Sequence, residues 1–251
     1  MSTGSGTHLR LRAAPILKMV GVTALVGAVI VAMVVALRSL PDFETTSRES
    51  PWVLSILVHV PQFAIPFAII AGITRGRISS YGFNARQKPP LFRHVNMLAL
   101  GAAFGLLLSL RYVPQIVAGE PVDVPRPVTP ANVLGTMAFQ WIVVGLCEET
   151  MFRGLVQTYL ENTLGGSVTM AGHRVHVGIV IGAVLWGLFH FINLLVMPTA
   201  SVLFTVVFTT LAGVAMGYAY HQTGSLLTTI IVHNTIFGVP LTIGYILNWL
   251  Q

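Results

Sequence analysis

Two adjacent carboxylates and an arginine stand in the middle of an otherwise apolar stretch of this chain. They are Glu148, Glu149 and Arg153, in the run Glu-Glu-Thr-Met-Phe-Arg. Ionisable side chains at membrane depth are costly and persist mainly where they pair, line a polar cavity or do chemistry. Two histidines, His190 and His233, interrupt apolar stretches further along. A carboxylate and two imidazoles can activate water, directly or through a bound metal, so the pattern indicates a hydrolytic centre.

Helical spacing gives the two glutamates different roles. Glu149 and Arg153 are four residues apart, so on an α-helix they share a face and can pair. Such a pair more often fixes a helix in place than does chemistry. Glu148 is rotated by about 100° from Glu149, and no basic residue stands three or four positions from it. We therefore predict that Glu148 is the general base.

Composition places the chain in a membrane. Of its 251 residues, 54% are hydrophobic and 9% are charged, whereas a soluble domain carries about 25% charged residues. The net charge of +6 would suit nucleic acid, but the basic residues flank apolar stretches and form no groove-sized patch, which excludes that partner. The single cysteine, Cys147, excludes an internal disulfide. We expect it to be a small buried hydrophobe.

Seven stretches are long and apolar enough to cross a bilayer, which takes about 20 residues. They cover residues 15–40, 52–74, 94–118, 132–158, 177–197, 200–220 and 225–249. The sequence therefore predicts an all-α fold, a polytopic bundle of seven transmembrane helices. We divide the chain into a polar cytoplasmic tail (1–14), N-terminal transmembrane helices (15–130) and a catalytic transmembrane core (131–251).

Lysine and arginine predict the orientation, because cytoplasmic loops carry an excess of them. Those on the N-terminal side are Arg10, Arg12, Lys18, Arg75, Arg77, Arg86, Lys88, Arg93 and Arg174. On the other side, Arg38, Arg48, Arg111 and Arg126 are diluted by Asp42, Glu44, Glu49, Glu120 and Asp123. We predict an integral protein of the cell membrane with a cytoplasmic N-terminus, an external C-terminus and an extended, proline-rich external segment at 119–130.

Depth connects the candidate residues. Counted from the predicted cytoplasmic ends of their spans, Glu148, His190 and His233 lie roughly 12–20 Å deep at 1.5 Å per residue. Trp186 and Asn193 share the helical face of His190. Each histidine alone would more often bridge to a neighbouring helix. Together with the carboxylate, they predict one shared site in the inner half of the bilayer.

The motif at 148–153 resembles the first signature of the CPBP family of intramembrane proteases. That family includes the endoproteases that process prenylated CAAX tails, and bacteriocin-processing or self-immunity proteins. The resemblance covers about residues 130–245. It implies a structural or assisting role for Glu149 and Arg153.

Two further signatures are present with departures. The family pattern Phe-x-x-x-His is Trp186-x-x-x-His190 here, with one aromatic residue in place of another. The pattern of a histidine followed four residues later by Asn or Asp is half met. His233 is present, but Phe237 stands at the fourth position and Asn234 directly follows the histidine.

The resemblance implies roles for the candidate residues. Glu148 would activate the water. His190 and His233 would bind a divalent metal, zinc being the expected ion, or stabilise the oxyanion if no metal is used. Asn193 or Asn234 would take over the missing amide and orient water or the oxyanion. The substrate would be a membrane-embedded or lipid-anchored peptide or protein, hydrolysed by a CAAX-type metalloprotease.

Two alternatives from other classes stay open. One is a catalytically inactive membrane scaffold or immunity-type protein of the same fold, which Phe237 allows. The other is a proton-coupled transporter with Glu148 and the histidines as a relay. A transporter predicts discontinuous helices and inverted repeats, which the sequence does not show. The intramembrane endopeptidase is the preferred interpretation.

Overall fold

The computed structural model describes residues 12–125 and 127–251. Most of the predicted tail, with Arg10, lies outside the described residues, as does Arg126. Seven helical segments in the described part are long and apolar enough to cross a membrane, so the predicted all-α bundle of seven spans is confirmed. They are α1 (Ala13–Arg38), α3 (Pro51–Thr74), α4 to α5 (His94–Ala118), α6 to α8 (Pro130–Thr163), α9 to η6 (Val177–Leu195), α10 (Thr199–Thr223) and α11 (Leu226–Leu250).

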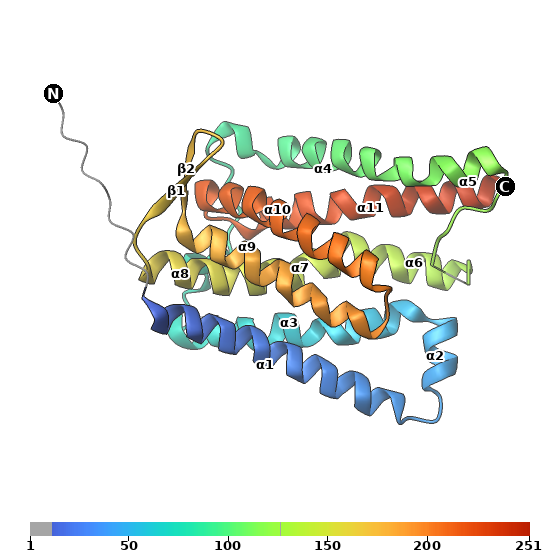
Figure 1. Ribbon diagram of the computed structural model, residues 1–251, viewed down its shortest axis with the longest axis horizontal. Helices are drawn as coiled ribbons and strands as arrows, with labels where there is room; N and C mark the ends of the chain where they lie inside the picture. Colours follow the sequence, from blue (N-terminus) through green and yellow to red (C-terminus); the bar gives the residue numbers. More distant parts are fainter. Residues whose placement is uncertain (1–11, 126) are drawn as a thin grey trace.

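Shorter elements connect the spans at the two ends of the bundle (Figure 1). At the hairpin end lie the strands β1 (Ser167–Met170) and β2 (His173–His176), with the 3-10 turns η1 (Ile78–Tyr81) and η2 (Pro90–Phe92). At the other end, which we call the α2 end, lie α2 (Phe43–Glu49), α5 (Val113–Ala118) and the C-terminus. The 3-10 turn η3 (Leu110–Tyr112) joins α5 to α4 (His94–Ser109). The N-terminus of α1 is at the hairpin end.

The β-hairpin was not predicted. Its strands pair antiparallel, with Ser167 opposite His176. Ala171 and Gly172 form the turn with φ of 47° and 79°, and two positive φ values in a two-residue turn match the twist of a hairpin. Strands of four residues are too short to show a clear alternation of apolar and polar residues, so no pattern in the sequence predicts them.

The fourth span is not a uniform α-helix. Its α segments α6 (Pro130–Ala138), α7 (Val144–Glu149) and α8 (Thr158–Thr163) are separated by two π-helical segments, η4 (Phe139–Val143) and η5 (Thr150–Gln157). The span runs to Thr163, five residues beyond the predicted end at 158. Glu148 therefore lies near the middle of its span, eighteen residues from Pro130 and fifteen from Thr163, and its position in the inner half of the bilayer stays a prediction. π-Helical turns are rare in proteins, but those that do occur are often found at functional sites.

Helix α11 is held closely against α4 and the fourth span. A Cβ added at Gly101 would lie 2.7 Å from Thr235 Cβ, and one at Gly105 would lie 2.7 Å from Val239 Cβ. A Gly-x-x-x-Gly spacing lets two transmembrane helices approach closely. This approach fixes the position of α11, which carries His233.

Two apolar clusters lie inside the bundle. The larger includes Met151, Phe152 and Leu155 of η5. The smaller, at the α2 end, includes Val122 and Val124 of the proline-rich segment. That segment has no helix between Gly119 and Pro130 in its described residues, as predicted, but it packs into the protein. Cys147 is buried, as expected.

Candidate active site

Glu148 is the last residue but one of α7 and is held by side chains from two other helices. Its Oε2 accepts a 2.7 Å hydrogen bond from the indole N–H of Trp186 on α9. Its Oε1 lies 3.6 Å from Nε2 of His59 on α3. The residue is 8% exposed. Spacing on its own helix left Glu148 without a partner, but packing of the bundle supplies two.

Glu149 connects the fourth span to α11. Its Oε1 accepts a hydrogen bond of 2.9 Å from Nη1 of Arg153 and one of 2.9 Å from Nδ1 of His233. Glu149 is 0% exposed and Arg153 is 2% exposed. The i,i+4 pair that the spacing predicted forms, although the π segment begins between the two residues. The second bond, to His233, was not predicted, and it gives Glu149 a direct part in orienting an imidazole.

Three imidazoles share one arrangement of their ring nitrogens. Nδ1 of His59 and Nδ1 of His190 lie 2.7 and 2.8 Å from the backbone oxygen four residues earlier on their helices. Nδ1 of His233 faces a carboxylate oxygen of Glu149. Carbonyl and carboxylate oxygens only accept, so each Nδ1 carries the proton. Each Nε2 is then left to accept a proton, bind a metal or, in the charged ring, donate.

Trp186 lies at the centre of these groups and is 1% exposed. Besides its bond to Glu148, its ring lies under the guanidinium of Arg153, with 4.0 Å from Cζ to the ring centroid. Its centroid is 5.8 Å from that of His190 and 5.6 Å from that of His233. The family signature has Phe here. Tryptophan fills the same space and adds an N–H donor that phenylalanine lacks.

Two cavities meet at Glu148 and His190. One, of about 430 Å³, lies among α1, α2, α3 and η6 (His190–Leu195) and is also lined by His59 and Asn193. The other, of about 740 Å³, lies among α4, the fourth span, α10 and α11 and is also lined by His233. Glu148, His190 and His233 thus line one cavity, as their predicted depths required. Their catalytic roles stay predictions.

The two candidate amides lie in different surroundings. Asn193, on the 3-10 segment η6, lines the smaller cavity. Asn234 accepts at Oδ1 from the backbone N–H of Gly145 and donates from Nδ2 to the backbone oxygen of Trp141, both at 2.9 Å. It therefore bridges α11 to the first π segment. Phe237 lines the larger cavity, with its ring 5.6 Å from that of His233, where the family signature has an amide.

The described residues do not provide a preformed set of ligands for the expected metal ion. Imidazole and carboxylate are groups that zinc accepts. Within residues 12–125 and 127–251, however, no three His, Cys, Asp or Glu side chains are gathered so that they could hold an ion. Ligation by His190 and His233 stays a prediction that metal analysis tests.

Sequence reasoning missed His59. It is the one ionisable side chain in the sequence of the second span, 51–74, and a lone ionisable group at membrane depth is by itself a sign of a functional site. No motif connects it to Glu148. Its ring also packs edge-on against Phe139 of η4, at 4.9 Å. Position and packing make His59 part of the wall behind the carboxylate.

Comparison with known proteins gives one match. Residues 130–237 match the model of a family described as type II CAAX prenyl endopeptidase Rce1-like. The match begins at α6 and ends at Phe237, so it contains Glu148, His190 and His233 but neither α1 nor α3. No curated protein and no solved structure matches the chain.

Proposed function

Since residues 130–237 belong to the CPBP family of CAAX-type proteases, we propose that the protein is an intramembrane endopeptidase. It hydrolyses peptide bonds of membrane-associated substrates with water that Glu148 activates. The observation that carries this proposal is the position of Glu148. Its buried carboxylate lies where two cavities meet, and His190 lines both of them.

The two oxygens of Glu148 divide the work. Oε2 is occupied by the N–H of Trp186, so Oε1 is left to take a proton from water. The hydroxide then forms a bond to the carbonyl carbon of the substrate. Nε2 of neutral His59 carries no proton and lies 3.6 Å from Oε1, so it can share the proton that Glu148 has accepted. The proton finally moves to the amide nitrogen as the C–N bond breaks, which gives an acid and an amine.

The negative oxygen of the tetrahedral intermediate needs a hydrogen-bond donor. His190 and His233 line the larger cavity, and each can donate from Nε2 when its ring is charged. The carboxylate of Glu149 accepts from Nδ1 of His233 and so stabilises the charged ring. On this account Glu149 positions and charges an oxyanion donor, while Arg153 balances the remaining negative charge.

The cavities suit an extended polypeptide. Their volumes of about 430 and 740 Å³ fall within the usual range of ligand sites, about 300–1,000 Å³. Because they meet at Glu148, a substrate strand can lie across the carboxylate with one side of its scissile bond in each cavity. A membrane-anchored segment that is extended around its scissile bond fits this description.

The test is cleavage of tagged, membrane-anchored reporter polypeptides in proteoliposomes. Glu148→Gln keeps the shape of the side chain and removes the base, so the rate should fall by about 10²–10⁴-fold with no loss of folded protein. Glu44→Gln, at an exposed position on α2, is the matched control and should keep the wild-type rate. Full activity of Glu148→Gln would reject the mechanism. If the wild-type protein cleaves nothing, the inactive scaffold that Phe237 allows becomes the better interpretation.

A further inference from the structure

We propose that the catalytic chamber admits its substrate from the extracytoplasmic side of the membrane. The substrates would then be outward-facing or exported segments of membrane-anchored polypeptides, and not tails presented from the cytoplasm. This inference rests on the proposed function and adds to it the class of substrate. It follows from three features: where the cavities lie, where the core is closed, and how charge is divided between the two ends.

The smaller cavity lies entirely in the half of the bundle toward the α2 end. Its residues on α1 run from Ile30 to Arg38, the last residues of that helix. Its residues on α3 run from Leu54 to Gln62, in the first half of that helix. Phe43 of α2 also lines it. The cavity thus runs from Glu148 toward α2.

The larger cavity runs the same way. On α4 to α5 it is lined by Leu108 and Arg111, near the α2 end of that span. On α10 it is lined by residues from Ala200 to Thr209, in the first half of the helix, which begins at the α2 end. His233 and Glu148 lie at its inner limit. Both cavities therefore lead from the carboxylate to the same end of the molecule.

The opposite direction is closed by the core. Every residue from Thr150 to Gln157 is buried, and Met151, Leu155 and Val156 are each 0% exposed. These residues form the part of the fourth span that follows Glu148 toward the hairpin end. Glu148 is fifteen residues before Thr163, or roughly 20 Å from that end at 1.5 Å per residue. A polypeptide entering from the hairpin end would have to displace this packed segment.

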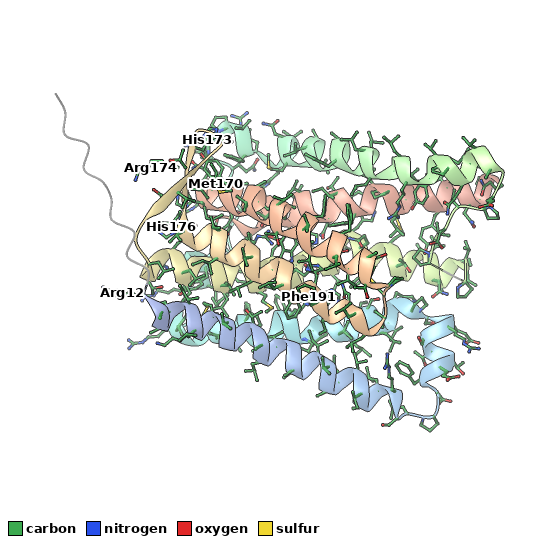
Figure 2. The ribbon with its side chains drawn as sticks, viewed as in Figure 1. Arg12, Met170, His173, Arg174, His176 and Phe191 are labelled. Atoms are coloured by element: carbon green, nitrogen blue, oxygen red, sulfur yellow. The ribbon has the colours of Figure 1, made fainter. Side chains whose placement is uncertain are left out.

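Charge identifies the hairpin end as cytoplasmic. The lysines and arginines that the structure describes there are Arg12, Lys18, Arg75, Arg77, Arg86, Lys88, Arg93 and Arg174, against the acidic Glu161. Arg12 and Arg174 are seen at this end in Figure 2. The described charges at the α2 end are Arg38, Arg48 and Arg111 against Asp42, Glu44, Glu49, Glu120 and Asp123. An excess of basic residues marks the cytoplasmic side, so the chamber opens outward.

Single cysteines at the two ends test the direction of access. Ser201, exposed at the start of α10, lines the larger cavity, and Ser80 is exposed in η1 at the hairpin end. In intact cells, a membrane-impermeant maleimide should label Ser201→Cys, whereas Ser80→Cys should react only after permeabilisation. The wild-type protein, whose Cys147 is buried, gives the background. Labelling of Ser80→Cys, and not Ser201→Cys, in intact cells would overturn the proposal.

Cleavage in cells separates this inference from the proposed function. Reporters that carry the same cleavable segment on either side of one transmembrane anchor should be cut only when the segment faces outward. A bulky maleimide on Ser201→Cys should lower that rate at least tenfold, and the same label on Ser80→Cys in permeabilised membranes should not. Cleavage confined to the cytoplasmic reporter would overturn outward access and leave the protease standing. Outward labelling of Ser201→Cys without cleavage of either reporter would reject the protease and, with it, the substrate class.

Discussion

The replacement of Trp186 by phenylalanine isolates one atom of the candidate site. Trp186→Phe keeps an aromatic ring, and it restores the residue of the family signature. It removes the indole N–H that donates to Oε2 of Glu148 at 2.7 Å. The carboxylate then loses a fixed donor in a buried position, and its orientation toward the water is no longer held from that side.

The expected loss can be estimated from the contacts of Trp186. A hydrogen bond to a charged group contributes about 1.5–3 kcal/mol. The guanidinium of Arg153 over the ring contributes about 0.5–2 kcal/mol, part of which the smaller ring retains. The free energy of unfolding of the variant should therefore be lower than that of the wild type by roughly 2–4 kcal/mol. If about 1.4 kcal/mol of that loss is felt in the transition state, kcat/KM falls tenfold.

The chain offers a matched control in Trp52. Its indole nitrogen is buried and has no hydrogen-bond partner among the described residues, so Trp52→Phe makes the same change of side chain without breaking such a bond. Thermal unfolding in detergent and reporter cleavage should both show a larger loss for Trp186→Phe. Equal stability and equal kcat/KM of the two variants would refute the assigned role of the indole N–H.

Four further predictions follow from the contacts of the site. Glu149→Gln weakens the partner of a buried cation and should lower the stability by about 3–5 kcal/mol in thermal unfolding; unchanged folded yield with lost cleavage would make Glu149 the base. His190→Ala and His233→Ala should each abolish reporter cleavage, and elemental analysis decides their role. A metal content that falls in both variants identifies ligands, whereas essential histidines in a metal-free protein act on the oxyanion. Asn234→Ala frees two backbone groups and should cost about 1–3 kcal/mol of stability, while Phe237→Asn, which supplies the family's amide, should raise cleavage; a lower rate would show that the ring is needed.

The sequence predicted those features that depend on composition or on spacing within one helix. Seven spans follow from apolar length, and the pair of Glu149 with Arg153 follows from a separation of four residues. The bond from Glu149 to His233 and the contact of Glu148 with His59 depend on how helices pack. No local pattern encodes them. The isolation of His59 in an apolar span was a usable sign, because such residues are rarely tolerated without a role.

The departures within the fourth span had no local sign either. The first π segment is stabilised from outside, since the side chain of Asn234 on α11 binds the backbone of Trp141 within η4 and of Gly145 just after it. The same contact explains why Asn234, predicted to orient water or the oxyanion, has both of its polar atoms bonded to backbone. Asn193 is the candidate amide that lines a cavity beside Glu148.

The two π segments also bear on insertions and deletions in this helix. A π turn is closed by bonds between residues five apart instead of four, so removing one residue from it restores an α turn without breaking the helix. Such a deletion in Thr150–Gln157 would leave the turns that follow facing nearly the same neighbours, because the π turn loses only its extra residue. Related chains that differ by one residue in this span should therefore carry the difference in η4 or η5. An alignment that puts the gap between the two glutamates would exchange the candidate base with its neighbour.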